Sequence, residues 1–497
     1  MTRPSCGACV IDHLTDLAML VVLLPLAGGL IIQLFADDHV GDHLNRVFAL
    51  TTAGAGLSLG GMDLWLRPAA TTGLLTIDPV AVVFLCVTSL VGMASALLSP
   101  RFLDGTTRSF FSPQRSRRWY YLGFYCFWAA LLAVPLAGNL GLAWLLVEAT
   151  TAASAPLVAF SGKRSALEAG WKYLILTTAG LTVALLGILV VYASAHDPGL
   201  GALGWTALSR LARHIPRDVV LVSFFMMMAG FAAKIGWAPV HNWLPDAHSE
   251  SPPPVSALLS AALLPTVMLV AWRVKIALGP ALGGNTASYL FIGFGLLSLA
   301  VAVPFLWRPM PLKRLLAYSS LEHMGIIALG IGFGTPLAIA GVVLHVAAHA
   351  GAKALGFYTA TPLLASRPSA AKLPVRGLAM SSPALASSFA LSLGTLGGVP
   401  PSPLFFSELF ILLGGFLAGQ VLAASLAALL LALGFLGLLH ALLEGLLGGR
   451  RHRVGTRSRH AAGVLAGFGA ATLSALVSLA FVLPGSFLVE AIVRWAS

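Results

Sequence analysis

The sequence predicts an all-α polytopic membrane protein with about fourteen transmembrane helices. Only 10% of its 497 residues are charged and 58% are hydrophobic, whereas soluble domains carry about 25% charged residues. Apolar segments of about 20 residues, the length that crosses a bilayer, recur along most of the chain with short polar breaks. We therefore expect most of the chain to lie in the lipid bilayer, with no soluble domain between the spans.

The expected spans follow one another at short intervals. They cover residues 17–36, 47–66, 79–98, 120–136, 139–160, 171–193, 219–240, 253–272, 286–306, 314–333, 336–361, 382–413, 419–445 and 461–490. Glycines and prolines in "KIGWAP" and "GTLGGVPPSP" predict broken helices in the seventh and the twelfth span. Asp12 and Asp16 interrupt the stretch after Arg3, so the N-terminus is not expected to be a cleaved signal.

The basic residues indicate the orientation of the chain rather than a nucleic-acid partner. The net charge is +12, but the Lys and Arg residues lie in loops between apolar spans. Loops after odd-numbered spans hold 19 of them and loops after even-numbered spans hold 6. Because basic loops tend to stay in the cytoplasm, we expect a multi-pass protein of the bacterial cytoplasmic (inner) membrane with both termini outside.

Three lysines remain inside the predicted spans, namely Lys172, Lys234 and Lys353. A buried lysine can lose its proton, whereas an arginine stays charged. Lys234 directly precedes the break of the seventh span, and Glu148 lies about 13 Å into the fifth. An ionisable group at mid-bilayer costs about 2.5 to 3.5 kcal/mol, so each is a candidate functional residue. The alternatives are a snorkelling lysine and a protonated, structural glutamic acid.

A row of titratable residues occurs in "LHVAAHAGAKALGF". His345, His349 and Lys353 are spaced at i, i+4 and i+8, so a helix would place them on one face. Such a row suits proton transfer through intervening waters. The alternative is a metal ion on the histidine pair, but the segment contains no carboxylate or thiol to complete a site, so no metal is predicted.

Glu408 follows the break of the twelfth span. Two Gly/Pro-broken spans in separate halves of a membrane chain indicate repeated units with a transport site at the breaks. Lys234 and Glu408 accompany these two breaks, which makes Glu408 a further candidate proton site.

Further candidates are expected beside this path. Glu322 and His323 are buried candidates, with a position at the membrane interface as the alternative. Lys172 is the third span lysine, and its alternative is a span-end residue that reaches the lipid headgroups. Glu444, with His440, approaches a basic loop and is a candidate cytoplasmic exit.

The turn "HNWLPDAHSE" after the seventh span holds the titratable residues His241, Asp246, His248 and Glu250. Acidic and imidazole groups at a pore mouth would collect protons, although a turn that caps the next helix would use the same residues. We keep both interpretations open.

No redox cofactor is predicted. Cys6 and Cys9 have CxxC spacing, with an external disulfide or a metal site with His13 as alternatives to two unpaired thiols in a frayed terminus. Cys86 and Cys126 lie alone, and the sequence contains no nucleotide loop, flavin motif or cysteine cluster. Any driving redox reaction is therefore expected in a partner subunit.

Four motifs resemble the proton-translocating antiporter-like membrane subunits. They are "AAKIGWAPVHNWLPDAHSESPPPVSALLSAALL", "KRLLAYSSLEHMGIIALGIGFG", "LHVAAHAGAKALGFYTATPLL" and "LGTLGGVPPSPLFFSELFIL". This family includes the large membrane subunits of respiratory complex I, the Mrp-type cation/proton antiporters and the membrane arms of energy-converting hydrogenases. "SSLEHMG" and the "SE" after the second break look most like the F-type membrane subunit of hydrogenase-four and formate hydrogenlyase complexes.

The resemblance implies two inverted five-helix repeats, a glutamate–lysine pair, a central histidine/lysine chain and an exit residue. The matching positions are Glu148 and Lys234 for the pair, His345, His349 and Lys353 for the chain, and Glu408 for the exit. Several relatives carry a lysine or histidine midway along the eighth span, whereas only Ser260 and Pro265 occur there, so water would have to bridge the gap.

The predicted organisation has four parts. Residues 1–119 form an N-terminal three-helix segment with a basic cytoplasmic loop, 120–277 the first repeat, 278–449 the second repeat, and 450–497 a basic loop and the last span. We expect a proton-translocating subunit of a respiratory or hydrogenase-type oxidoreductase complex, working with other membrane and peripheral subunits. The alternatives are a sodium or potassium/proton antiporter subunit, a membrane coupling subunit for inorganic-carbon uptake, and a structural scaffold.

Overall fold

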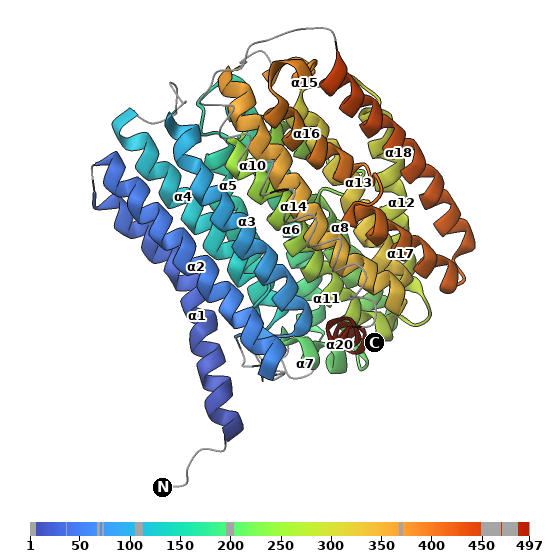
Figure 1. The fold of residues 1–497 in the computed structure, drawn as a ribbon. Coiled ribbons are helices and arrows are strands. Elements are labelled where there is room, and N and C mark those ends of the chain that lie inside the picture. The colour runs from blue at the N-terminus through green and yellow to red at the C-terminus, as the bar shows by residue number, and fades with distance from the viewer. Residues whose placement is uncertain are drawn as a thin grey trace. The chain divides into compact units, whose positions relative to one another are not determined.

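The computed structural model describes residues 6–35, 37–66, 70–71, 74–104, 113–194, 203–366, 371–448, 469 and 486–496, and these residues are nearly all helical (Figure 1). Within these ranges, eleven helices are long and apolar enough to cross a membrane, and two shorter apolar helices accompany them. The predicted all-α membrane fold is confirmed. The count of fourteen spans stays a prediction, because most of the last expected span, 461–490, lies outside the described residues.

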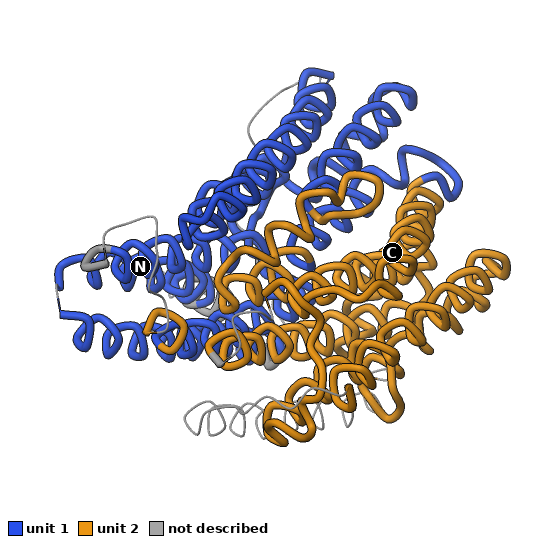
Figure 2. The backbone as a smooth tube through the Cα atoms, turned by 90° about the horizontal axis from the view of Figure 1, so that it is seen from above, with its two compact units in different colours: residues 1–100, 107–234, 265–286 blue, residues 101–106, 235–264, 287–497 orange. Residues whose placement is uncertain are grey.

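The chain divides into two compact units, which Figure 2 colours separately. Unit 1 comprises residues 1–100, 107–234 and 265–286, and unit 2 comprises residues 101–106, 235–264 and 287–497. This division follows contacts between residues rather than internal symmetry. The predicted repeat boundaries at residues 119, 277 and 449 therefore stay a prediction.

Unit 1 is a layer of long helices with a short hairpin. Its elements are α1 (Cys6–Gln33), α2 (Asp38–Leu66), β1 (Ala70–Thr71), β2 (Thr76–Ile77), α3 (Pro79–Asp104), α4 (Pro113–Ala133), α5 (Leu140–Val158), α6 (Arg164–Ala193), α7 (Trp205–Ala212), α8 (Arg217–Ile235) and α11 (Leu264–Leu282). α1 packs against α2 and α4, α4 against α5, and α5 against α6. The Asn139 side chain starts α5 by accepting a hydrogen bond from the Leu142 backbone N–H at 2.8 Å.

Unit 2 is arranged around one long helix, α14. Its elements are α9 (Leu244–Glu250), α10 (Pro253–Leu258), the π-helical turn η2 (Leu259–Leu263), α12 (Thr286–Leu306), α13 (Leu312–Phe333), α14 (Pro336–Ser366), α15 (Leu378–Ser381), α16 (Pro383–Leu396), α17 (Pro403–Leu417), α18 (Val421–Leu447) and α20 (Phe487–Ala496). α14 packs against α10, α13, α16 and α17. Because neighbours cover several of its faces, titratable side chains on α14 can be removed from both lipid and water.

Both predicted breaks are present. α8 ends at Ile235 and α9 begins only at Leu244, whereas α16 ends at Leu396 and α17 begins at Pro403. A left-handed glycine opens each break, with φ of 79° at Gly236 and 69° at Gly398. Glycine adopts this conformation without the steric cost that a Cβ atom brings.

The π-helical turn η2 was not predicted. It lies in the expected eighth span and contains Ser260. The hydroxyl oxygen of Ser260 is 2.7 Å from that of Ser320 on α13.

Candidate functional site

Lys234 near the end of α8 is completely buried within unit 1. Its Nζ donates hydrogen bonds to Thr151 Oγ1 of α5 at 2.7 Å and to Tyr173 Oη of α6 at 2.6 Å. The ammonium also lies 4.5 Å from the centroid of the Tyr173 ring, within cation–π distance. The cation is therefore held by neutral oxygens and an aromatic ring.

Small residues bring α6 and α8 close enough for this contact. A Cβ atom at Gly180 would collide with the Ala233 side chain, and one at Gly230 would collide with the Gly180 carbonyl. Larger residues at these two positions would separate the helices. The glycines thus allow a residue on α6 to reach the side chain of Lys234.

Glu148 lies one helical turn before Thr151 on α5, so both side chains share one face. One carboxylate oxygen of Glu148 accepts a hydrogen bond from Thr178 Oγ1 at 2.6 Å, and the other has no hydrogen-bond partner among the described residues. In the described part of unit 1, the ammonium of Lys234 contacts hydroxyls rather than this carboxylate. Within the part of this unit that the structure describes, Glu148 and Lys234 are therefore each hydrogen-bonded to hydroxyl groups rather than to one another.

The row on α14 has the predicted geometry. His345, His349 and Lys353 all lie on this helix and all are completely buried. Lys353 Nζ donates to the Leu316 carbonyl oxygen at 2.6 Å and makes a short hydrogen bond to Ser319 Oγ, both on α13. As at Lys234, a buried ammonium is satisfied by uncharged oxygen atoms.

A second histidine, from α13, joins this row. His323 Nδ1 lies 3.1 Å from His345 Nε2, and His345 Nδ1 lies 2.9 Å from Ser407 Oγ of α17. The Ser407 hydroxyl donates to the Leu404 carbonyl, so it accepts the Nδ1 proton of His345. This leaves the Nε2 lone pair of His345 directed at His323, and three helices contribute to one hydrogen-bonded chain.

Two carboxylates lie in the same unit. Glu408 of α17 places an oxygen within 4.8 Å of one ring nitrogen of His323 and one of His345. Glu322 of α13 is buried, with 3% of its surface exposed, and its Oε2 has no hydrogen-bond partner in the described ranges. Both Glu322 and His323 therefore lie inside the helix packing, and their depth in the membrane stays a prediction.

His349 is the least satisfied residue of the row. Neither of its ring nitrogens has a hydrogen-bond partner among the described residues, although the side chain is completely buried. Its ring centroid lies 5.1 Å from that of His323 and 6.4 Å from that of His345. Buried polar groups are normally hydrogen-bonded, so this position favours a bound water or a proton carrier.

The titratable side chains of the turn after the seventh span differ in their exposure: that of Asp246 is partly exposed, whereas that of His248 is buried. Asp246 forms an ion pair with Arg314 at 3.3 Å, and burial lowers the pKa of His241 below its ordinary value. His248, in contrast, is completely buried between the rings of Trp243 and Phe357, with no hydrogen-bond partner for either ring nitrogen in the described chain. The titratable residues of this turn thus do not all face the surface together, as a proton-collecting cluster at a pore mouth would require.

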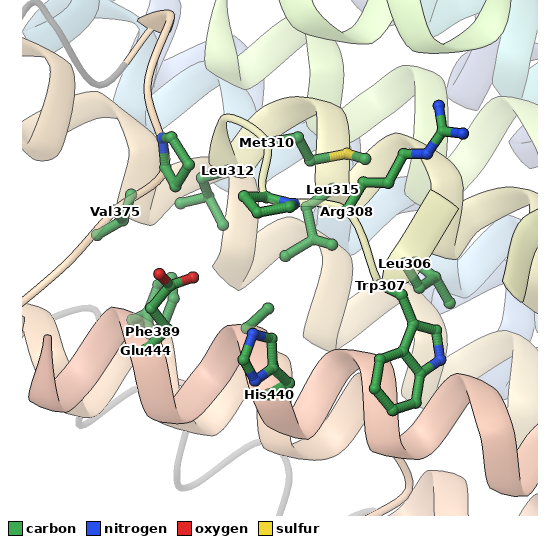
Figure 3. A pocket seen from close by; sticks show the side chains of 13 residues that line it. Leu306, Trp307, Arg308, Met310, Leu312, Leu315, Val375, Phe389, His440 and Glu444 are labelled. Carbon is green, nitrogen blue, oxygen red and sulfur yellow. The ribbon is translucent and has the colours of Figure 1, made fainter. Parts of the chain in front are cut away.

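Lys172 and Glu444 lie away from these buried groups. The exposed side chain of Lys172 forms an ion pair with Glu168 at 2.6 Å, which fits the alternative of a lysine at the membrane edge. Glu444 of α18 pairs with Arg376 and lines a pocket together with His440. Figure 3 shows the side chains of His440 and Glu444 on one wall of this pocket and Met310 on the opposite wall.

Sequence reasoning missed the hydroxyl groups that hold the charged residues. These are Thr151, Tyr173, Thr178, Ser319 and Ser407. Hydroxyl residues are common in apolar helices, so their presence alone does not identify a functional residue. The only indication in the sequence is a position close to a titratable residue, as for Ser407, which directly precedes Glu408. Cys6 and Cys9 begin α1, but their side chains lie outside the described ones.

Comparison with known sequences gives one consistent family. Residues 137–434 match the family described as "NADH:quinone oxidoreductase/Mrp antiporter, TM". The chain is 30% identical over 423 residues to a "Hydrogenase-4 component F homolog" of Methylacidiphilum infernorum, covering 84% of this chain and 88% of the relative. It is 29% identical over 427 residues to "NADH-quinone oxidoreductase subunit N" of Desulforudis audaxviator, covering 81% of each.

Solved structures share the fold. A chain of the membrane-bound sulfane sulfur reductase, an archaeal respiratory membrane complex, superposes with a TM-score of 0.83 at 19% identity, covering 96% of this chain and 97% of that one. A chain of the Mrp complex from Dietzia sp. gives 0.78 at 18% identity, with coverage of 97% and 99%. A chain of respiratory complex I from Thermus thermophilus gives 0.74 at 23% identity, with coverage of 94% and 100%.

Proposed function

The chain belongs to the NADH:quinone oxidoreductase/Mrp antiporter membrane family, and from this premise we propose that it is the proton-translocating subunit of a redox-driven membrane complex. The family resemblance predicted from the four motifs is confirmed, including the similarity to hydrogenase-four component F. The observation that carries the proposal is the burial of Lys234. Its ammonium donates hydrogen bonds to two neutral hydroxyls, and one of them, on Thr151, lies one helical turn from Glu148.

Unit 1 supplies the first proton site. A buried ammonium is stable only while hydrogen bonds and a nearby negative charge offset its desolvation. Thr151 and Tyr173 provide the hydrogen bonds, and Glu148 on the same face as Thr151 provides the charge. A change in the charge or position of Glu148 would shift the balance between the protonated and the neutral lysine.

Unit 2 supplies the second proton site. Imidazole accepts a proton on one ring nitrogen and releases one from the other, and His323 and His345 already share a hydrogen bond. Lys353 lies two turns beyond His345 on α14, and Glu408 lies beside both histidines. We assign Lys353 to receive or release protons at one end of this group and Glu408 to pass them on toward the exit.

The energy would come from partner subunits. This chain has no sequence motif for a nucleotide, flavin or iron–sulfur cluster, and its similar structures are chains of multi-subunit complexes. We propose that a charge change in a neighbouring subunit displaces Glu148 electrostatically, so that proton movement needs no covalent chemistry in this chain. A hydrogenase, formate-oxidising or quinone-reducing module would provide the driving reaction.

Membrane orientation and internal repeats complete the proposal. The excess of basic residues in loops after odd-numbered spans supports a cytoplasmic location for those loops and an outer location for both termini. Gly236 and Gly398 each precede a proline by three residues, which supports equivalent breaks in two repeats, residues 120–277 and 278–449. Cysteine labelling from each side of inside-out and right-side-out vesicles tests the orientation.

The central test compares two lysine variants of the intact complex in proteoliposomes. Lys234→Met removes the buried proton site, whereas Lys172→Met removes an exposed lysine paired with Glu168. We expect the first to abolish redox-driven proton uptake and the second to preserve it, with both complexes assembled and turning over. Unchanged proton movement in assembled Lys234→Met would contradict the proposed role of Lys234, and the same result in Glu148→Gln would favour a scaffold role. Flux that requires sodium or potassium would identify an antiporter.

A further inference from the structure

We propose that His323, His345 and Glu408 form a binding site for a divalent transition-metal ion, with Zn²⁺ as its best-suited ligand. One donor atom from each of the three side chains lies within 4.8 Å of the other two. They come from α13, α14 and α17, three helices that pack directly against one another. The third ligand, Glu408, is 63 residues from His345 in the sequence and lies outside the α14 segment.

The spacing of the two histidines fits a tetrahedral metal. With Zn–N bonds of about 2.0 to 2.1 Å, two nitrogens of one tetrahedral zinc are about 3.3 Å apart. His323 Nδ1 and His345 Nε2 are 3.1 Å apart. Zinc binding would release the proton that His323 Nδ1 now donates to His345 Nε2, and both rings would turn until their lone pairs point at the metal. The distance between the two nitrogens would change by only about 0.2 Å.

Ser407 orients one of these ligands. Metal-bound histidines usually donate their second ring N–H to a nearby oxygen, which fixes the tautomer and directs the lone pair of the first nitrogen at the metal. His345 Nδ1 lies 2.9 Å from Ser407 Oγ, and the Ser407 hydroxyl hydrogen is given to Leu404. The Nε2 lone pair of His345 is thus already directed toward His323 and the proposed site.

The donor set selects the class of ion. Two imidazoles and one carboxylate suit zinc and neighbouring first-row divalent ions, whereas calcium and magnesium prefer oxygen ligands alone. A carboxylate with two imidazoles leaves a fourth position for water, as in open zinc sites. His349, whose ring centroid is 5.1 Å from that of His323 and whose nitrogens have no partner among the described residues, is a second candidate for that position.

A bound ion would close the proton path through unit 2. The metal would occupy the His345 nitrogen lone pair that otherwise accepts a proton, and it would hold the Glu408 carboxylate in place. Zinc is therefore expected to inhibit proton translocation reversibly, and this inhibition rests on the proposed function. The binding site itself does not rest on it, because it follows from the three donors and from Ser407.

Binding is tested directly on the purified complex that contains the full chain. Cys6→Ser/Cys9→Ser serves as the background, since a CxxC pair can bind zinc by itself. After Zn²⁺ loading and removal of free metal, elemental analysis should find about one more ion per chain in this background than in its His323→Ala or Glu408→Gln derivative. His214→Gln, an exposed histidine of unit 1, should retain the full amount.

Two further measurements remain decisive if those variants fail to assemble. Ser407→Ala should weaken zinc binding about 10-fold to 100-fold, the usual effect of losing the acceptor behind a ligand histidine. X-ray absorption on the zinc-loaded background should show imidazole and carboxylate ligation. Equal zinc uptake in the background and in assembled His323→Ala, or zinc ligated without imidazole, would overturn the site.

Proton flux separates this inference from the proposed function. Zinc that binds with imidazole ligation and also stops flux supports both. Zinc that binds in the same way without any effect on flux supports the metal site and overturns the proton route through His345. Zinc that stops flux equally in the background and in assembled Ser407→Ala, without imidazole ligation, acts elsewhere and overturns the metal site.

Discussion

Tyr173 and Lys234 are joined by a 2.6 Å hydrogen bond from the buried ammonium to the phenolic oxygen, although they lie on different helices. The phenolic oxygen is also 2.8 Å from Ser154 Oγ on α5. Three helices therefore meet at a single buried lysine. The contact matters because hydrogen bonds to charged groups contribute about 1.5 to 3 kcal/mol, which is enough to shift the equilibrium between the protonated and the neutral lysine.

Replacing Tyr173 with phenylalanine should impair proton movement without disrupting the fold. Tyr173→Phe keeps the aromatic ring over Lys234 but removes one of its two hydrogen bonds. The loss corresponds to about 10-fold or more in the protonation equilibrium of the lysine. Redox-driven proton uptake by proteoliposomes should fall accordingly, whereas the exposed Tyr289→Phe should behave as wild type. Equal rates in both variants would show that the hydroxyl has no part in proton transfer.

A permanent charge at position 234 should also stop transport. Arg stays protonated at all accessible pH values, so Lys234→Arg keeps the cation but removes its ability to release a proton. We expect assembled complexes with normal turnover of the partner enzyme and no coupled proton uptake, measured with a pH-sensitive dye. Full activity of this variant would mean that the charge alone, and not its release, is what the site requires.

The sequence was informative where a residue type conflicted with its surroundings. Lys234, Lys353 and Glu148 stand out because charged side chains are expensive in an apolar span. Glycines and prolines predicted both breaks because few other residues permit them. The spacing of His345 and His349 predicted one helical face, since it matches the period of the α-helix.

The contacts between helices could not be read in the same way. Tyr173 is 61 residues from Lys234 and Ser407 is 62 from His345, so these pairs depend on how the helices pack. A tyrosine or serine in an apolar span has many ordinary roles, and nothing in its local sequence identifies its partner. The π-helical turn η2 was missed for a similar reason, because no distinct residue pattern marks it.

Removing the Ser407 hydroxyl should disturb the orientation of His345. Ser407→Ala deletes the acceptor of the Nδ1 proton and leaves a buried donor unpaired, at a cost of about 1 to 3 kcal/mol. Coupled proton uptake should fall, and Ser407→Thr, which restores a hydroxyl, should recover most of it. The exposed Ser387→Ala is the matched control. Failure of the threonine variant to rescue would indicate a packing role for Ser407 instead of a role in orientation.

Breaking a buried ion pair should strongly destabilise unit 1. Arg273 Nη2 lies 2.6 Å from Asp78 Oδ2, with only 2% and 11% of the two side chains exposed, and Asp78 Oδ1 also accepts from the Ala81 N–H at the start of α3. Asp78→Ala would leave the Arg273 charge buried and unpaired, which typically costs about 3 to 5 kcal/mol. The exposed pair of Arg494 and Glu490 should contribute less than about 1 kcal/mol, so Glu490→Gln is the control. Thermal unfolding in detergent should therefore show a large fall in midpoint for Asp78→Ala and almost none for the control. A comparable midpoint for the two variants would mean that water or a rearranged partner compensates the arginine.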